Sequence, residues 1–186
     1  MKISIYLALG LTITGIIFGI AFGYYLTPEY KTSMYDKNEM DLGLADRTFD
    51  LRYINAMIAH HRGAMLLAEQ LGKGTSRPEM KALSEGILKD EPVAIAELYA
   101  WKKDWYQDSK IVRDPVVPVL GSADDTFDLR FLNAIIAHHE AGIVMTKETR
   151  LKSSRTEILN NADAVEAFLL NGLSALKGFR SEWYKI

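Results

Sequence analysis

Hydrophobic residues form two kinds of pattern along the chain, one continuous and one periodic. From Ile3 to Leu26 there are 24 residues without a charged side chain. A helix of this length rises about 36 Å, which is enough to span a hydrocarbon core of roughly 30 Å. After residue 47 the apolar residues instead recur at spacings of three and four, as in amphipathic helices. The pattern predicts a transmembrane helix over 1–26 followed by helices that pack on one another.

The apolar segment has two interpretations, an uncleaved anchor or a cleaved signal peptide. A signal peptide has an apolar region of about 7–15 residues and ends at a small-x-small site. Here the run is longer, and the nearest such triplet, Ala21-Phe22-Gly23, is followed by bulky residues. Lys2 precedes the segment, so the positive-inside rule places the N-terminus in the cytoplasm. We therefore expect a single-pass cell-membrane protein whose remaining chain is extracytoplasmic, either periplasmic or extracellular.

Three glycines within this segment, Gly15, Gly19 and Gly23, repeat at four-residue spacing. Such a stripe of small residues lets two membrane helices approach closely, which predicts a homodimer. Glycine is also simply common in membrane helices. Both interpretations of the stripe stay open.

A duplication organises the rest of the chain. The 14 residues from Thr48 to His61 return from Thr126 to His139 with eleven identities and an offset of 78 residues. The same offset also aligns the segments downstream, which defines two units over 48–106 and 126–184. Between them lies a connector over 107–125, and before them a polar stretch over 27–47 that is typical of a stalk.

Each unit has the pattern of a helical hairpin. Thr48 and Thr126 suit helix starts, and Pro78 suits the first turn of the second helix of unit one. Two hairpins that each expose an apolar face bury it by packing together. We therefore expect an all-α four-helix bundle over 48–186. Asp50 and Asp128 fall at the helix starts, where we expect them to pair with Arg52 and Arg130.

All four histidines lie in two HH pairs, one in each repeat: His60, His61, His138 and His139. At 100° per residue both members of each pair fall on the apolar side of their helix, near its midpoint. Four imidazoles are therefore expected at the centre of the bundle. A metal ion is one reason to gather them, and a hydrogen-bonded polar layer in the core is the other.

Three further residues are candidate metal ligands. Met57, His61 and Met65 share one helical stripe, and a thioether with an imidazole suits copper. Met is also an ordinary core residue, and the second repeat has Ile at both positions. Glu91 occupies an inward position at the level of the histidines, where repeat two has Leu169. Pro92 beside it could instead turn this carboxylate to solvent.

Composition narrows the chemistry. The net charge is −2, which provides no basic surface for nucleic acid. The chain has no Cys, so thiolate nucleophiles and Cys-ligated metals are excluded. Any soft-metal site is thereby restricted to Met and His side chains.

The doubled pattern F-D-x-x-[FY]-[IL]-x-A-[MI]-I-x-H-H-x-[GA]-[AG] resembles the bacterial domain of unknown function 305, a ferritin-like family that includes CopM-type copper-binding proteins. The resemblance covers both repeats. It implies a ferritin-like bundle and an extracytoplasmic protein that binds copper or another transition metal through His60, His61, His138, His139, Met57 and Met65. The chain lacks the Met-rich tails of copper binders, which argues against high-capacity storage.

The sequence supports three alternative functions. The leading hypothesis is a membrane-anchored metal-binding protein that handles copper without catalysis. The second is a structural or interaction module with a polar histidine layer and no metal. The third is a di-metal oxidoreductase of the ferritin kind, which would need Glu-x-x-His on two helices. Met57 and Ile135 stand where those glutamates would be, so the sequence disfavours an enzyme.

Overall fold

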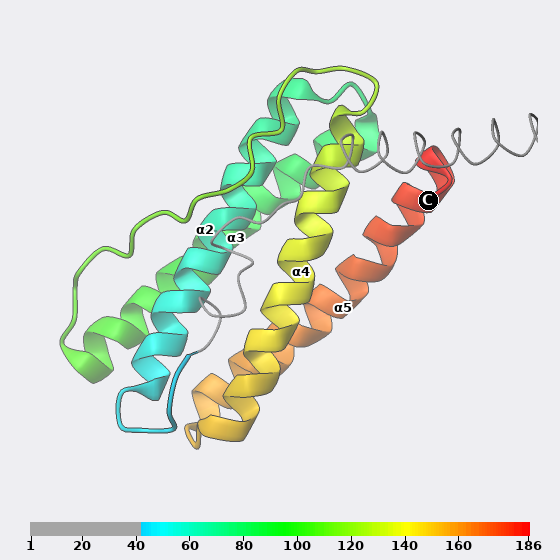
Figure 1. Cartoon of the computed structure of the whole chain (residues 1–186). Coiled ribbons are helices and arrows are strands. Elements are labelled where there is room, and N and C mark those ends of the chain that lie inside the picture. The colour runs from blue at the N-terminus through cyan, green and yellow to red at the C-terminus, as the bar shows by residue number, and fades with distance from the viewer. Residues whose placement is uncertain (1–41) are drawn as a thin grey trace, which may run out of the picture. The chain divides into compact units, whose positions relative to one another are not determined.

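The computed structural model describes residues 42–186, and within that range the secondary structure is entirely helical (Figure 1). Four helices follow one another: α2 (Phe49–Gly74), α3 (Pro78–Tyr106), α4 (Phe127–Lys152) and α5 (Thr156–Tyr184). Helix α2 packs along α3 and α4 packs along α5, and the two hairpins meet mainly through α2 and α4. The all-α four-helix bundle built from two hairpins is confirmed.

The predicted transmembrane helix over 1–26 and its glycine stripe lie outside the described residues. So does the stalk as far as residue 41. In the range 42–186, no helix is both long enough and apolar enough to cross a membrane.

The connector between the hairpins crosses the length of the bundle. Helix α3 ends at one end of the bundle and α4 begins at the other, so α2 and α4 run antiparallel (Figure 1). Asp114 forms an ion pair with Arg62 of α2 at 2.8 Å. Gln70 of α2 donates to the Pro118 carbonyl at 3.0 Å and accepts from the backbone N–H of Leu120 at 2.9 Å. These bonds hold the connector on α2, and Leu120 is buried there.

An arginine organises the start of each repeat. Arg52 donates to the Leu42 carbonyl at 2.5 Å and to the Asp46 carboxylate at 3.0 Å. Arg130 makes the equivalent bonds 78 residues later. Each loop contains a glycine with positive φ, 78° at Gly43 and 76° at Gly121, where an L side chain would be strained. The structural repeat therefore extends back to residue 42.

The expected pairing of Arg52 with Asp50 is wrong. Asp50 accepts a hydrogen bond from Ser153 at 2.7 Å and lies 3.4 Å from the guanidinium of Arg155, both at the turn between α4 and α5. The guanidinium also lies over the Trp105 ring, 4.1 Å from its centroid. The reason is the antiparallel arrangement, because it brings the start of α2 to the end of α4.

We call this set of an aspartate, an arginine and a tryptophan a clasp, and a second clasp lies at the other end of the bundle. It shows that the expected pairing of Arg130 with Asp128 is also wrong. Arg77 lies 3.2 Å from the Asp128 carboxylate and over the Trp183 ring, 4.4 Å from its centroid. The two clasps join each hairpin to the other. They fix the relative height of α2 and α4, and with it the height of the histidines.

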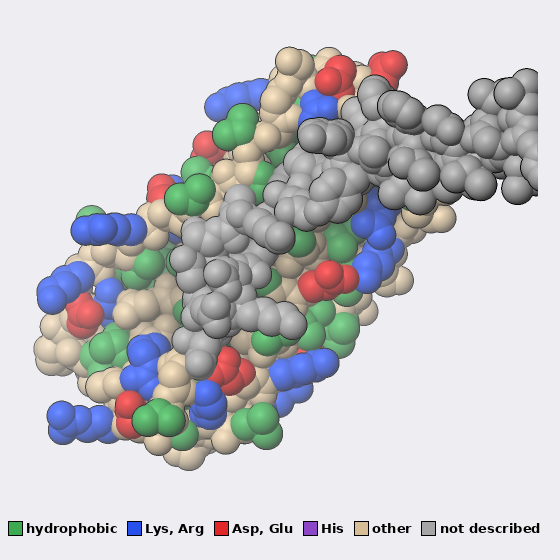
Figure 2. Space-filling view, viewed as in Figure 1, with side chains coloured by type: hydrophobic (Ala, Val, Ile, Leu, Met, Phe, Trp, Pro, Cys, Tyr) green, Lys and Arg blue, Asp and Glu red, His purple; other side chains and the backbone are tan. Residues whose placement is uncertain are grey.

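The core of the described residues is apolar above and below the histidines. Its most deeply buried side chains come mainly from α2 and α4, and they include Phe49, Tyr53, Ile54, Met57, Ile58, Leu67, Phe131 and Leu132. Figure 2 shows acidic and basic side chains interspersed over the outward face of the bundle. That surface agrees with the near-neutral charge of the chain.

Candidate metal centre

The four histidines come together at the centre of the bundle. Each is at most 9% exposed. The rings of His60 and His138 are stacked across the interface of α2 and α4, with centroids 3.8 Å apart and an interplanar angle of 22°. His61 and His139 flank this pair, with ring centroids 6.1 Å and 6.2 Å from those of their sequence neighbours. The two clasps hold α2 and α4 at the same height. Because each HH pair lies near the midpoint of its helix, the two pairs meet.

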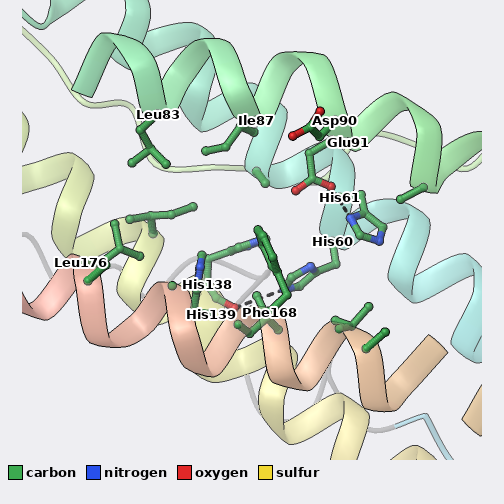
Figure 3. A pocket seen from close by; sticks show the side chains of 18 of the residues that line it. His60, His61, Leu83, Ile87, Asp90, Glu91, His138, His139, Phe168 and Leu176 are labelled. Carbon is green, nitrogen blue, oxygen red and sulfur yellow. Dashed lines mark hydrogen bonds and ion pairs between the residues drawn. The ribbon is translucent and has the colours of Figure 1, made fainter. Parts of the chain in front are cut away.

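Hydrogen bonds determine which ring nitrogens carry protons. His60 Nε2 lies 3.2 Å from the His138 carbonyl oxygen, and because that oxygen can only accept, Nε2 is the donor. His61 Nδ1 donates to the Glu91 carboxylate (Figure 3). A neutral His61 then presents a lone pair at Nε2, which is buried and has no hydrogen-bond partner among the described residues. This nitrogen is available to a ligand.

Burial keeps the imidazoles of His60, His138 and His139 neutral. Burial, with a smaller contribution from the neighbouring His61, lowers the pKa of His60 to about 3. Burial also lowers the pKa of His138 well below its ordinary range. The pKa of His139 is lowered by burial too, although the Ile135 carbonyl and the Glu91 carboxylate oppose the shift. Neutral imidazole is the form that binds a metal ion.

Two glycines make room for the rings. A Cβ added at Gly142 would lie 2.5 Å from His60 Nε2, and one added at Gly172 would lie 2.7 Å from His139 Nε2. Real side chains do not approach so closely. Gly142 lies three residues after His139, next to Ala141, and small residues so close to the pair indicate space beside the rings. Gly172 on α5 becomes recognisable only once the bundle is assembled.

A cavity of about 350 Å³ adjoins the histidines. It lies between α3 and α5, which share no extensive contact in the described bundle. Its walls are mostly aliphatic and aromatic, and its polar members are the four histidines, Asp90 and Glu91 (Figure 3). The opening leads from the surface to the imidazole cluster.

The structure brings five of the seven predicted ligands into this cavity, namely the four histidines and Glu91. Glu91 points inward despite the adjacent Pro92, because α3 continues through the proline as a helix. Met57 lies in the hydrophobic core, and Met65 is half-buried with its sulfur 3.8 Å from the Arg62 guanidinium. Neither methionine lines the cavity.

The described side chains do not form a ready-made coordination sphere. Within residues 42–186 there is no group of three or more His, Asp or Glu side chains placed so that it could hold a metal ion. The stacked rings of His60 and His138 face one another instead of aiming their nitrogens at one point. Coordination by more than one imidazole would therefore require the rings to turn, and the adjoining cavity provides space for that movement.

Comparison with known proteins finds a family model that matches part of the chain and solved structures that share its fold. Residues 50–116 match the family described as domain of unknown function (DUF305). Among solved structures, CopM in the Cu(I)-bound form matches with a TM-score of 0.65 at 24% identity, over 73% of this chain and 97% of that one. CopM in the Cu(II)-bound form matches with a TM-score of 0.62 at 25% identity, over 73% and 98%. No curated protein matches the sequence.

The family match begins two residues after the start of the first repeat and continues into the connector. The CopM structures extend the likeness to most of the described bundle. Over residues 50–116 the chain is similar to the DUF305 family, and over most of the described bundle it shares the fold of CopM.

Proposed function

We propose that this protein binds a copper ion at the histidine cluster and handles the metal without catalysing a reaction. The observation that carries the proposal is the buried Nε2 of His61, a lone-pair donor without a partner among the described residues and beside a cavity open to the surface. A histidine whose other nitrogen donates to a carboxylate is the usual arrangement of a metal ligand.

One chemical argument and one structural comparison favour copper over other metals. Imidazole nitrogen binds copper in both of its common oxidation states, and divalent copper binds such ligands more tightly than other first-row metals. CopM, whose fold this chain shares, has been solved in Cu(I)-bound and Cu(II)-bound forms. The metal would be held by His61 together with other imidazoles of the cluster.

The experiment is a titration of the purified full chain in detergent with Cu(I), Cu(II), Zn(II) and Fe(II). We expect copper to bind with a dissociation constant below about 1 μM, equivalent to about −8 kcal/mol. His61→Ala should weaken binding at least tenfold. Met65→Leu, which changes a candidate ligand outside the cavity, should leave binding unchanged. Glu97→Leu on the exposed side of α3 is the control.

The titration also has results that would contradict the proposed copper site. Binding weaker than micromolar, or binding that His61→Ala leaves unchanged, would contradict a copper site. The histidines would then be a polar layer of the core, as the bond from His60 to the His138 carbonyl already permits. A loss of affinity in Met65→Leu would instead support the predicted thioether ligand.

We also propose that residues 1–26 anchor the protein in the cell membrane, with the bundle on the extracytoplasmic side. The support is the uncharged run from Ile3 to Leu26. Because the chain has no cysteine, Lys103→Cys provides a single label site on the bundle. A membrane-impermeant maleimide should label it in intact cells. Labelling only after lysis would contradict this orientation.

The glycine stripe adds an oligomeric prediction to the same anchor. If Gly15, Gly19 and Gly23 form a helix–helix contact, the full chain is a homodimer in detergent. Gly19→Leu should convert it to a monomer, measured by light scattering. A dimer that persists in this variant would place the contact elsewhere.

A further inference from the structure

The two repeats are not equivalent around the histidines. The offset of 78 residues relates His61 to His139, and it also relates Asp90-Glu91 on α3 to Phe168-Leu169 on α5. Both segments line the cavity. One wall therefore carries two carboxylates at the place where the other carries two apolar side chains (Figure 3).

This difference gives the two flanking histidines different surroundings. His61 Nδ1 is bonded to a carboxylate that is itself only 14% exposed. The repeat-two counterpart of that carboxylate, Leu169, is 3% exposed and offers no acceptor. The Nε2 of His139 instead faces the backbone of α5 closely enough that a Cβ at Gly172 would lie 2.7 Å away.

A cation entering this cavity needs a nearby negative charge. Moving an ion next to aliphatic and aromatic walls is costly unless a charge of opposite sign compensates it. Of the side chains that line the cavity, only Asp90 and Glu91 are acidic. Asp90 is exposed to solvent, so Glu91 is the carboxylate closest to the buried imidazoles.

We propose that Glu91 is the positioning residue that confines the metal to the repeat-one half of the cluster, so that each chain binds one ion at His61. Glu91 holds the proton on His61 Nδ1, which leaves the Nε2 lone pair for the metal, and it supplies the compensating charge. The repeat-two half lacks both contributions because Leu169 stands in that place. The inference rests on the proposed copper site.

The first test is made on the metal-free protein. Full chain labelled with ¹⁵N at its four histidines reports the protonated nitrogen of each ring by NMR. We expect His61 to carry its proton on Nδ1 in the wild type and in Glu91→Gln, whose amide oxygen still accepts. In Glu91→Leu, which removes the acceptor, the proton should redistribute to Nε2.

The second test is copper stoichiometry and affinity. The wild type should bind one equivalent, and Glu91→Leu should weaken binding by about 10–100-fold, the usual effect of removing the partner of a ligating histidine. Glu91→Gln should lose less, since it keeps the hydrogen bond. Glu97→Leu on the exposed side of α3 is the matched control and should bind as the wild type does.

The third test moves the carboxylate to the other repeat. Combining Glu91→Leu with Leu169→Glu should restore tight binding of one equivalent, now dependent on His139 instead of His61. Circular dichroism of each variant identifies any loss of folding, and if the combined variant does not fold, the two single Glu91 variants still decide the question.

The outcomes separate this inference from the proposed function. If the wild type binds copper and Glu91→Leu binds it equally well with an unchanged His61 spectrum, the copper site stands and the role of Glu91 is overturned. Two equivalents with equal affinity in the wild type would also overturn it. If the wild type binds no copper at all, both the proposed function and this inference fail.

Discussion

At the level of single residues, Glu91 determines the surroundings of His61, which its position in the sequence does not show by itself. The sequence places it on the inward seam of its helix but follows it with Pro92, which leaves its direction open. In the structure the helix runs through the proline, and the carboxylate reaches His61. A proline in a long helix removes one backbone hydrogen bond, and packing against α2 is sufficient to keep the helix continuous here.

Space beside the rings is as important as their direction. We expect Gly142→Ala to lower the free energy of unfolding by about 1–3 kcal/mol, because its Cβ would overlap His60 and Leu169. Gly178→Ala makes the same change on α5, where the Cβ would meet nothing. That control should stabilise the protein by up to about 1 kcal/mol through helix propensity. Urea denaturation measures both, and equal effects would show that crowding at the histidines is unimportant.

Burial of neutral imidazoles makes stability depend on pH. The pKa values of His60, His138 and His139 are lowered in the folded protein. In the unfolded chain they return to about 6.5. The unfolded state therefore binds more protons below this pH, so stability is full above it and is lost as the pH falls. The slope is about 1.4 kcal/mol per pH unit for each such histidine.

The measurement is the free energy of unfolding of the metal-free chain between pH 7.5 and pH 5. It should be nearly level around pH 7.5 and fall below about pH 6.5, and His60→Leu should have a shallower slope there because it lacks one buried imidazole. A flat profile would mean that the histidines are not held neutral by the fold.

At the scale of helices, the clasps connect the two hairpins. Asp50 and Arg155 come from different hairpins, and Trp105 lies under the guanidinium. A double-mutant cycle on Asp50→Ala and Arg155→Ala should give a coupling energy of about 0.5–1 kcal/mol, since the carboxylate is mostly shielded from solvent. The exposed pair of Lys177 and Glu140 is the control, with coupling near zero. Equal coupling in the two cycles would contradict a clasp.

Helix boundaries were predictable because the repeat supplies the same signals twice. Thr48, Thr126 and Pro78 mark helix starts in the sequence, and the helices begin at Phe49, Phe127 and Pro78. The expected partners of Asp50 and Asp128 were wrong, because pairs across the hairpins depend on which ends of the bundle meet. No periodicity within one helix contains that information.

At the scale of the whole bundle, the duplication predicts the four helices and the meeting of the histidines. It does not predict their antiparallel order, since midpoints coincide in either arrangement. The cavity and the stacking of His60 on His138 likewise depend on how α3 and α5 diverge around the pair formed by α2 and α4. Differences between the repeats, above all Glu91 against Leu169, are visible in the sequence. Their effect on the histidines depends on the cavity, which only the assembled bundle contains.

In the proposed site, copper binds to imidazole nitrogen at the centre of this bundle. The most direct measurement is the X-ray absorption spectrum of the full chain loaded with one equivalent of Cu(I). We expect nitrogen ligands with the multiple-scattering features of imidazole, and the loss of these features in a variant with all four histidines changed to alanine. A spectrum with sulfur ligands alone, as from Met57 and Met65, would contradict it.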